Sequence, residues 1–101
     1  MLEGSHSRLI PVVAHAGDGN IHAAVSADVT SAADVDVAEE VIELIAAKAV
    51  RLGGTVTGEH GIGSLKRHLL TYALDDTSRE VHRRIKVALD PLGILNPGRG
   101  I

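Results

Sequence analysis

The chain of 101 residues contains no cysteine, no tryptophan and no phenylalanine, and it has a single tyrosine. Without cysteine, a disulfide framework and a thiolate metal site are both excluded, so any metal ligands must be His, Asp or Glu. Without large aromatic side chains, the core has to be built from Val, Ile, Leu and Ala. A chain of this length buries only about two-thirds of its unfolded surface, so we expect a small core.

The chain also lacks an excess of positive charge and long apolar runs. Its formal net charge of −3 argues against a nucleic-acid partner. No apolar run approaches the ~20 residues of a transmembrane helix, and the first residues lack the apolar stretch of a signal peptide. We therefore expect a cytoplasmic protein without a membrane span. Residues 1–7, MLEGSHS, resemble an expression tag or a disordered start, and residues 8–101 are expected to form the domain.

Two histidines bracket a tight turn in residues 15–22, HAGDGNIH. Asp-Gly between apolar runs predicts a β-hairpin with a type I′ turn, and its strands are expected over residues 9–16 and 20–28. In that register, which a four-residue loop over residues 17–20 would also give, His15 faces His22 directly, with Cβ atoms roughly 4.5–5.5 Å apart. Two imidazoles at this spacing can share one divalent metal ion, or they can simply pair across the hairpin.

A second segment, GGTVTGEHGIG over residues 53–63, carries five glycines. Glycine at this density indicates unusual backbone angles or the close approach of another group. We predict a third strand over residues 55–59, and successive strand residues point to opposite faces. This favours Glu59 as a third metal ligand beside the two histidines and His60 as an acid/base in the adjoining space. The alternative is a glycine-rich bend with a surface Glu and His.

The strongest helical pattern covers residues 31–52. Ser31 with Asp34 resembles a capping pair, and acidic residues crowd the first turns, as the helix dipole favours. Gly53 is expected to end this helix as its C′ residue.

Two further helices are expected towards the C-terminus. A short one over residues 64–70 presents Lys66, which either orients an anionic substrate or is simply solvated. A capping box formed by Thr77 and Glu80 predicts the start of the last helix, and Pro91 is expected to stop it.

Three ordered segments resemble the C-terminal part of the FAD-linked oxidases, the D-lactate, glycolate and D-2-hydroxyglutarate dehydrogenase-like enzymes of the vanillyl-alcohol-oxidase superfamily. They are HAGDGNIH (residues 15–22), GGTVTGEHGIG (residues 53–63) with Lys66 following, and ALDPLGILNPGR (residues 88–99). The resemblance covers residues 9–99. We expect an α+β fold, an antiparallel sheet with helices packed on one face, and the resemblance implies that it forms the later half of a ferredoxin-like cap domain.

The resemblance also implies an activity, namely oxidation of a small 2-hydroxy acid with hydride transfer to FAD. In metal-dependent members, the positions matching His15, His22 and Glu59 bind a divalent ion, for which we expect zinc or manganese. The position matching His60 is the general base. The tail residues that the resemblance places along the flavin are Asn96, Pro97, Gly98 and Arg99.

The departures from the family pattern are equally informative. Family chains are several times longer, and their FAD-binding domain lies N-terminal to this region. We therefore expect a C-terminal piece that is inactive alone, with the FAD-binding domain as its partner and with self-association through its exposed half-sheet. Arg99 replaces the usual tail lysine, and Ala24 replaces an asparagine that contacts substrate in some members. A non-catalytic metal-binding or oligomerisation module is the alternative function, and two His with one carboxylate also match non-haem iron oxygenases.

Overall fold

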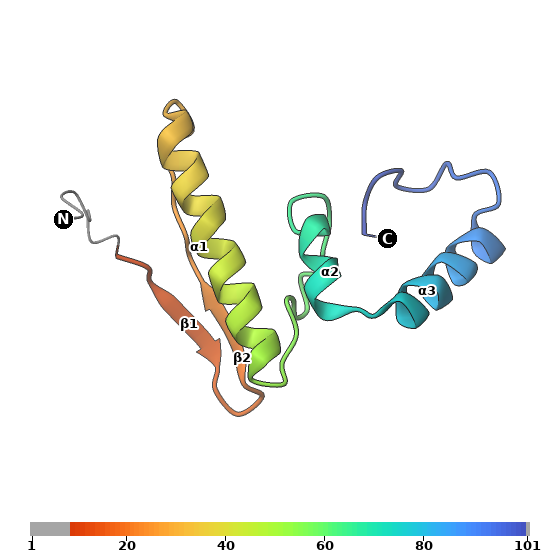
Figure 1. Ribbon diagram of the computed structural model, residues 1–101, viewed down its shortest axis with the longest axis horizontal. Helices are drawn as coiled ribbons and strands as arrows, with labels where there is room; N and C mark the ends of the chain where they lie inside the picture. The colour runs from red at the N-terminus through yellow and green to blue at the C-terminus, as the bar shows by residue number, and fades with distance from the viewer. Residues whose placement is uncertain (1–8, 101) are drawn as a thin grey trace. The chain divides into compact units, whose positions relative to one another are not determined.

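The computed structural model of the protein describes residues 9–100, so the predicted tag over residues 1–7 lies outside the described residues. Two short antiparallel strands precede a long helix and a set of shorter helices (Figure 1), which confirms the predicted α+β class. The elements are β1 (Val12–His15), β2 (Asn20–Ala23), α1 (Ala32–Arg51), η1 (Arg67–Leu69), α2 (Leu70–Ala73) and α3 (Asp76–Leu89). The chain forms two compact units, one ending at Ile42 and the other beginning at Glu43. The ferredoxin-like arrangement with helices on one face stays a prediction.

The hairpin is shorter than predicted and has a different register. Each strand has four residues, and His15 pairs with Asn20 while Val13 pairs with His22. The predicted direct pairing of His15 with His22 is therefore wrong by two residues. Its basis, a type I′ turn, is also wrong, because only Gly19 in the loop has a positive φ, of 70°. A loop of four residues connects the strands instead.

Helix α1 begins and ends close to the predicted residues. The amide of Asp34 donates to the hydroxyl of Ser31 over 3.3 Å, so Ser31 caps the N-terminus as predicted. At the other end Gly53 has a φ of 83°, and the amide of Gly54 donates to the carbonyl of Ala49 over 2.9 Å. These contacts are those of a Schellman motif, which confirms Gly53 as the C′ residue.

The two later helices start at other residues than predicted. Helical backbone is present where a short helix was expected over residues 64–70, but it begins only at Arg67, three residues later than predicted. The capping box of Thr77 and Glu80 is also wrong, because the carboxylate of Asp75 accepts from the amide of Ser78 over 2.7 Å and makes Asp75 the N-cap of α3. An ionised carboxylate is a strong acceptor for the orphan amides of a helix N-terminus, so it wins over a hydroxyl two residues later.

The two candidate caps of α3 can be separated by mutation. We expect Asp75→Ala to lower the melting temperature by several degrees, because it leaves the amide of Ser78 without its acceptor. Thr77→Ala should change the melting temperature by about one degree or less. Thermal melts followed by far-UV circular dichroism measure both variants, and a larger loss for Thr77→Ala would restore the capping box.

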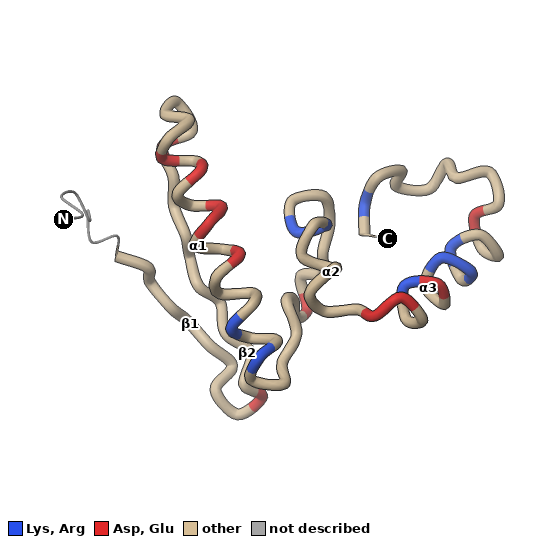
Figure 2. The backbone as a smooth tube through the Cα atoms, viewed as in Figure 1, with Lys and Arg blue, Asp and Glu red and all other residues tan. Residues whose placement is uncertain are grey.

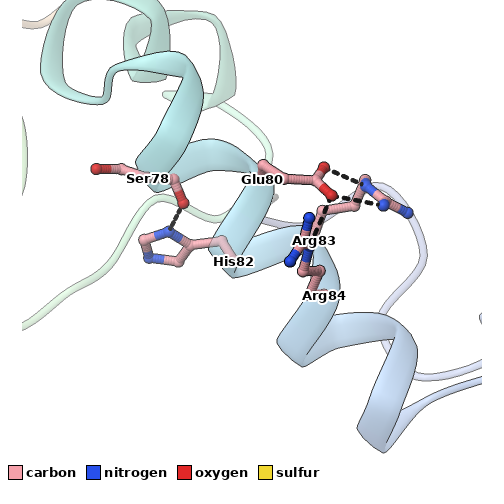
Figure 3. Close-up of polar contacts among 5 residues, drawn as sticks. All are labelled: Ser78, Glu80, His82, Arg83 and Arg84. Atoms are coloured by element: carbon pink, nitrogen blue, oxygen red, sulfur yellow. Dashed lines mark hydrogen bonds and ion pairs between the residues drawn. The ribbon is translucent and has the colours of Figure 1, made fainter.

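Glu80 joins two arginines on the exposed side of α3 (Figure 3). Its carboxylate accepts from Nε of Arg83 over 2.7 Å and from Nε of Arg84 over 2.9 Å. The hydrogen bonds from Arg83 and then Arg84 lower the pKa of Glu80 from 4.5 to about 2. Glu80 is thus committed to pairs within the helix and does not reach back to a cap.

This cluster of Glu80, Arg83 and Arg84 makes the stability of α3 depend on pH in the acidic range. A carboxyl whose pKa is lowered by folding stabilises the folded state fully above its unfolded value and loses that contribution as the pH falls through its folded value. The contribution of Glu80 should therefore fade between pH 4.5 and about 2. We expect Glu80→Gln to reduce the slope of melting temperature against pH in this window. Because the pairs are exposed, high salt should shrink the difference between the two proteins.

The buried interior is small and aliphatic, as the composition predicts. Leu69 is 1% exposed, and the other buried apolar residues among those described are Ala38, Ala46 and Val56. Many larger apolar side chains stay exposed, among them Val13 at 69% and Ile21 at 66% on the hairpin. Self-association through such surfaces stays a prediction. Figure 2 shows the acidic residues on the first turns of α1 and the basic residues on α3.

Candidate functional site

The hairpin brings the imidazoles of His15 and His22 together on one face of its sheet. His15 is the last residue of β1, and His22 lies two residues past its partner Asn20 on β2. The two histidines are thus diagonal neighbours, which long side chains bridge easily. Their ring centroids lie 5.4 Å apart and their planes cross at 81°. The predicted proximity is confirmed, although its predicted register is not.

This spacing fits a shared metal ion. Two imidazoles bound to one tetrahedral zinc ion, each at ~2.0–2.1 Å, place their ring centroids about 5 Å apart. His15 is exposed and His22 is half-buried, so the face remains open for further ligands. Nitrogen ligands of this type suit zinc and other first-row divalent ions.

The loop between the histidines is shaped by one of its two glycines. The amide of Asp18 donates to the carbonyl of His15 over 3.0 Å, and Gly19 then takes a left-handed conformation that leads into β2. Gly17 has no such conformation, and a Cβ added there would meet no atom within 4 Å. The loop therefore needs glycine at position 19 and not at position 17.

The predicted strand over residues 55–59 is wrong, and Glu59 and His60 lie in a turn. The amide of Gly61 donates to the carbonyl of Gly58 over 3.1 Å, and the hydroxyl of Thr57 donates to the carbonyl of Gly61 over 2.6 Å. Gly61 has a φ of 69°, which a strand does not accommodate. Glycine on both sides of the Glu-His pair thus favours a turn over a strand.

In this turn Glu59 and His60 do not point to opposite faces. Nε2 of His60 lies 3.9 Å from a carboxylate oxygen of Glu59, and their side chains are 76% and 49% exposed. The separation is longer than a hydrogen bond, so the contact is electrostatic and requires a protonated imidazole. The alternation argument that gave the two residues separate roles is therefore wrong, and the roles themselves stay predictions.

The C-terminal tail returns to the segment that follows this turn. The guanidinium of Arg99 donates to the hydroxyl of Ser64, and the amide of Gly100 donates to the carbonyl of Gly63 over 2.8 Å. Nε of Arg67 donates to the carbonyl of Gly100 over 3.1 Å. The structure thus joins two of the segments singled out in the sequence, and the half-buried Lys66 lies between Ser64 and Arg67 in the chain.

Asp90 is a residue that the sequence analysis missed. Its side chain is only 4% exposed, and it accepts from Nζ of Lys86 over 2.5 Å. It also accepts from the amides of Ile94 and Leu95 over 3.1 and 3.0 Å. The hydrogen bond from Lys86 is the main cause that lowers the pKa of Asp90, and burial opposes it. The available signal was the position of Asp90 inside the segment ALDPLGILNPGR.

The other described histidines have local contacts. Nδ1 of His82 lies 2.7 Å from the carbonyl oxygen of Ser78 on α3 (Figure 3). Nε2 of His68 lies 3.7 Å from a carboxylate oxygen of Glu43. Both histidines are exposed.

These motifs are those of a known family. Residues 5–99 match the family described as FAD linked oxidases, C-terminal domain, and the chain belongs to this family. It is 40% identical to the glycolate oxidase subunit GlcD of Bacillus subtilis over 85 residues, or 84% of this chain. It is 38% identical over 89 residues, or 88% of this chain, to a protein of Danio rerio named probable D-lactate dehydrogenase, mitochondrial. No solved structure matches the chain.

The chain spans only a small part of these relatives. The matched segment makes up 18% of the Bacillus subtilis protein and 18% of the Danio rerio protein. For the mitochondrial D-lactate dehydrogenase (cytochrome) of Arabidopsis thaliana, with 40% identity over 93 residues, it makes up 16%. Within the described part of this chain, no helix has the length and apolar character needed to cross a membrane.

Proposed function

We propose that this chain supplies a metal site and a catalytic base to an FAD-linked oxidoreductase that oxidises a small 2-hydroxy acid. The observation that carries the proposal is the pair of imidazoles on the hairpin, 5.4 Å apart, in a chain of the FAD-linked oxidase family. The names of its relatives support a substrate of the glycolate or lactate type. Oxidation of the 2-hydroxyl group of such an acid needs a group that weakens the O–H bond and a base that removes its proton.

In this proposal His15, His22 and Glu59 hold a divalent ion, zinc or manganese, and leave positions open for a substrate hydroxyl and carboxylate oxygen. The bound ion supplies Lewis acidity at that hydroxyl, and FAD, carried by another part of the full-length protein, supplies the redox chemistry. A carboxylate as third ligand suits either metal. The single negative charge of Glu59 also leaves the site with net positive charge for an anionic substrate.

His60 is proposed to accept the hydroxyl proton. Its imidazole is 76% exposed and so open to an incoming substrate, and the flanking Gly58 and Gly61 add no side chains around it. Lys66 is proposed to orient the substrate carboxylate. The tail residues Asn96, Pro97, Gly98 and Arg99 are proposed to lie along the flavin, because the resemblance to the family places them there.

The proposal can be tested on the chain itself with cobalt as a spectroscopic probe in place of zinc. We expect one Co²⁺ per chain, and we expect D-lactate or glycolate to change the visible spectrum of the bound ion because the hydroxyl and carboxylate bind it together. Propionate, which lacks the hydroxyl, should change the spectrum far less. The purified chain should be colourless before cobalt is added.

The outcomes separate the proposal from the alternative function. A chain that binds cobalt but gives equal spectra with lactate and propionate would be a metal-binding module without a 2-hydroxy-acid site. A chain in which His15→Ala leaves the cobalt spectrum unchanged would remove the metal site from the proposal. Stoichiometric FAD in the purified chain would show that the flavin site does not need another domain.

A further inference from the structure

We propose that Asp90 and Lys86 are positioning residues that hold the C-terminal tail, residues 94–100, against the segment after His60. Asp90 is the one charged residue among those described whose side chain is almost fully buried, at 4% exposure. A charge in such a place is retained only with hydrogen-bonding partners, and Asp90 has three. Two of the three donors are amides at the start of the tail, and the third, Lys86, also donates to the carbonyl of Leu95.

The tail is anchored at its first end by this cluster. The amides of Ile94 and Leu95 donate to the two carboxylate oxygens of Asp90. Nζ of Lys86 bridges Asp90 and the carbonyl oxygen of Leu95, at 2.5 and 2.6 Å. One buried carboxylate and one ammonium thus satisfy both the donor and the acceptor groups of the turn after α3.

The tail is anchored at its second end by the segment 63–67. The carbonyl of Gly63 accepts from the amide of Gly100, Ser64 accepts from Arg99, and Arg67 donates to the carbonyl of Gly100. Between the anchors, Asn96 takes a positive φ of 47°. Asparagine adopts this left-handed conformation more readily than most residues, and the carbonyl of Asn96 accepts from the amide of Arg99 over 3.2 Å.

Between its anchors the tail borders a hollow of about 770 Å³ within this unit. Its lining includes Leu70, Ile85 and Leu89 from the helices, Leu95 and Arg99 from the tail, and Lys86 with Asp90. The tail forms part of the wall of this hollow, and the hydrogen bonds at the two anchors help to fix its path. Loss of the first anchor should therefore be felt at the second, ten residues further along the chain.

The test is amide hydrogen exchange, followed by NMR on the 101-residue chain. In Asp90→Asn we expect the amides of Ile94 and Leu95 to exchange about tenfold faster or more, because they lose a charged acceptor. The decisive measurement is the amide of Gly100, which donates to the carbonyl of Gly63 rather than to Asp90 and should exchange at least about threefold faster. The matched control is Asp76→Asn, which removes an exposed carboxylate from the same helix.

A second pair of variants guards against misfolding of Asp90→Asn. Lys86→Met keeps the carboxylate and its two amide donors but removes the bridge, and it should also speed exchange at Gly100. Lys86→Arg restores a donor and should return the exchange at Gly100 towards that of the unaltered chain. Unchanged exchange at Gly100 in both Asp90→Asn and Lys86→Met would overturn the proposal and leave Asp90 as a local cap of α3.

The bearing of this device on catalysis rests on the function proposed above, which places the tail along the flavin. The exchange experiment requires no metal, flavin or substrate. Failure of the tail to respond would therefore count against Asp90 and Lys86 alone, whereas failure of cobalt to bind would count against the metal site alone.

Discussion

Replacing His15 or His22 with alanine should lower the affinity of the chain for Zn²⁺ or Mn²⁺ by at least about a hundredfold. Changes to residues that only orient metal ligands cost up to about this much, so loss of a direct ligand should cost no less. The two imidazoles are already 5.4 Å apart, and removing one leaves a single nitrogen ligand on the hairpin. Titration calorimetry with zinc measures the effect directly.

The same titration examines Glu59. We expect Glu59→Gln to weaken zinc binding sharply, because an amide oxygen carries no charge to offset that of the ion. Binding of zinc to the unaltered chain should also weaken below about pH 6, since imidazole ligates only when it is neutral. Glu59→Gln that binds zinc as tightly as the unaltered chain would show that another group completes the site.

Two histidines provide the controls for this series. His68 and His82 are exposed and have contacts within their own unit, to Glu43 and to the carbonyl of Ser78. His68→Ala and His82→Ala should leave zinc affinity within about twofold of the unaltered chain. A large loss in either control would indicate binding of zinc to scattered surface histidines.

Replacing His60 with alanine should leave the metal in place and remove most of the turnover. In a full-length oxidoreductase that contains this segment, we expect kcat for a 2-hydroxy acid to fall about 10²–10⁴-fold, which is the usual contribution of a general base. KM should change little, because His60 is assigned to proton removal and not to substrate binding. Steady-state kinetics with a dye acceptor measure both constants.

The role of His60 as a base also makes a chemical prediction. In His60→Ala, added imidazole should restore part of the turnover, because a small base can occupy the space that the side chain leaves. His82→Ala should behave like the unaltered enzyme with and without imidazole. Turnover retained in His60→Ala would assign proton removal to another residue, and zinc affinity measured on the same variant would show whether the site is still intact.

Sequence reasoning predicted the histidine pair but not its register. The observed register differs from the predicted one by two residues, and a shift of two keeps every side chain on the same face of the sheet. The two imidazoles therefore share one face in either register. The exact partners depend on the loop, and the Asp-Gly pattern suggested a two-residue turn. In the structure the carbonyl of His15 accepts a hydrogen bond from the amide of Asp18, and the loop between the strands has four residues. The competing loop conformations differ by local hydrogen bonds that alternation of polar and apolar residues does not reveal.

In the second motif, residues 53–63, the glycines favour a turn in place of the predicted strand. The β-branched residues before Glu59 favour a strand, but a strand also needs a neighbour to accept its backbone hydrogen bonds. In the described part of the chain only β1 and β2 pair with each other. Gly58 and Gly61 close a turn instead, which depends on no distant partner.

The anchoring of the tail by Asp90 was also beyond sequence reasoning, because it depends on burial of one particular carboxylate.

Gly17 carries a further consequence for how this chain tolerates mutation. The fold itself makes no demand for glycine there, since its φ is not positive and the space around a Cβ is open. Gly19 and Gly53, in contrast, have left-handed backbones that most residues adopt only with strain. A library selected for folding should therefore accept many residues at position 17 and few at positions 19 and 53. A library selected for function that returns only glycine at position 17 would mark the place where another molecule approaches the hairpin.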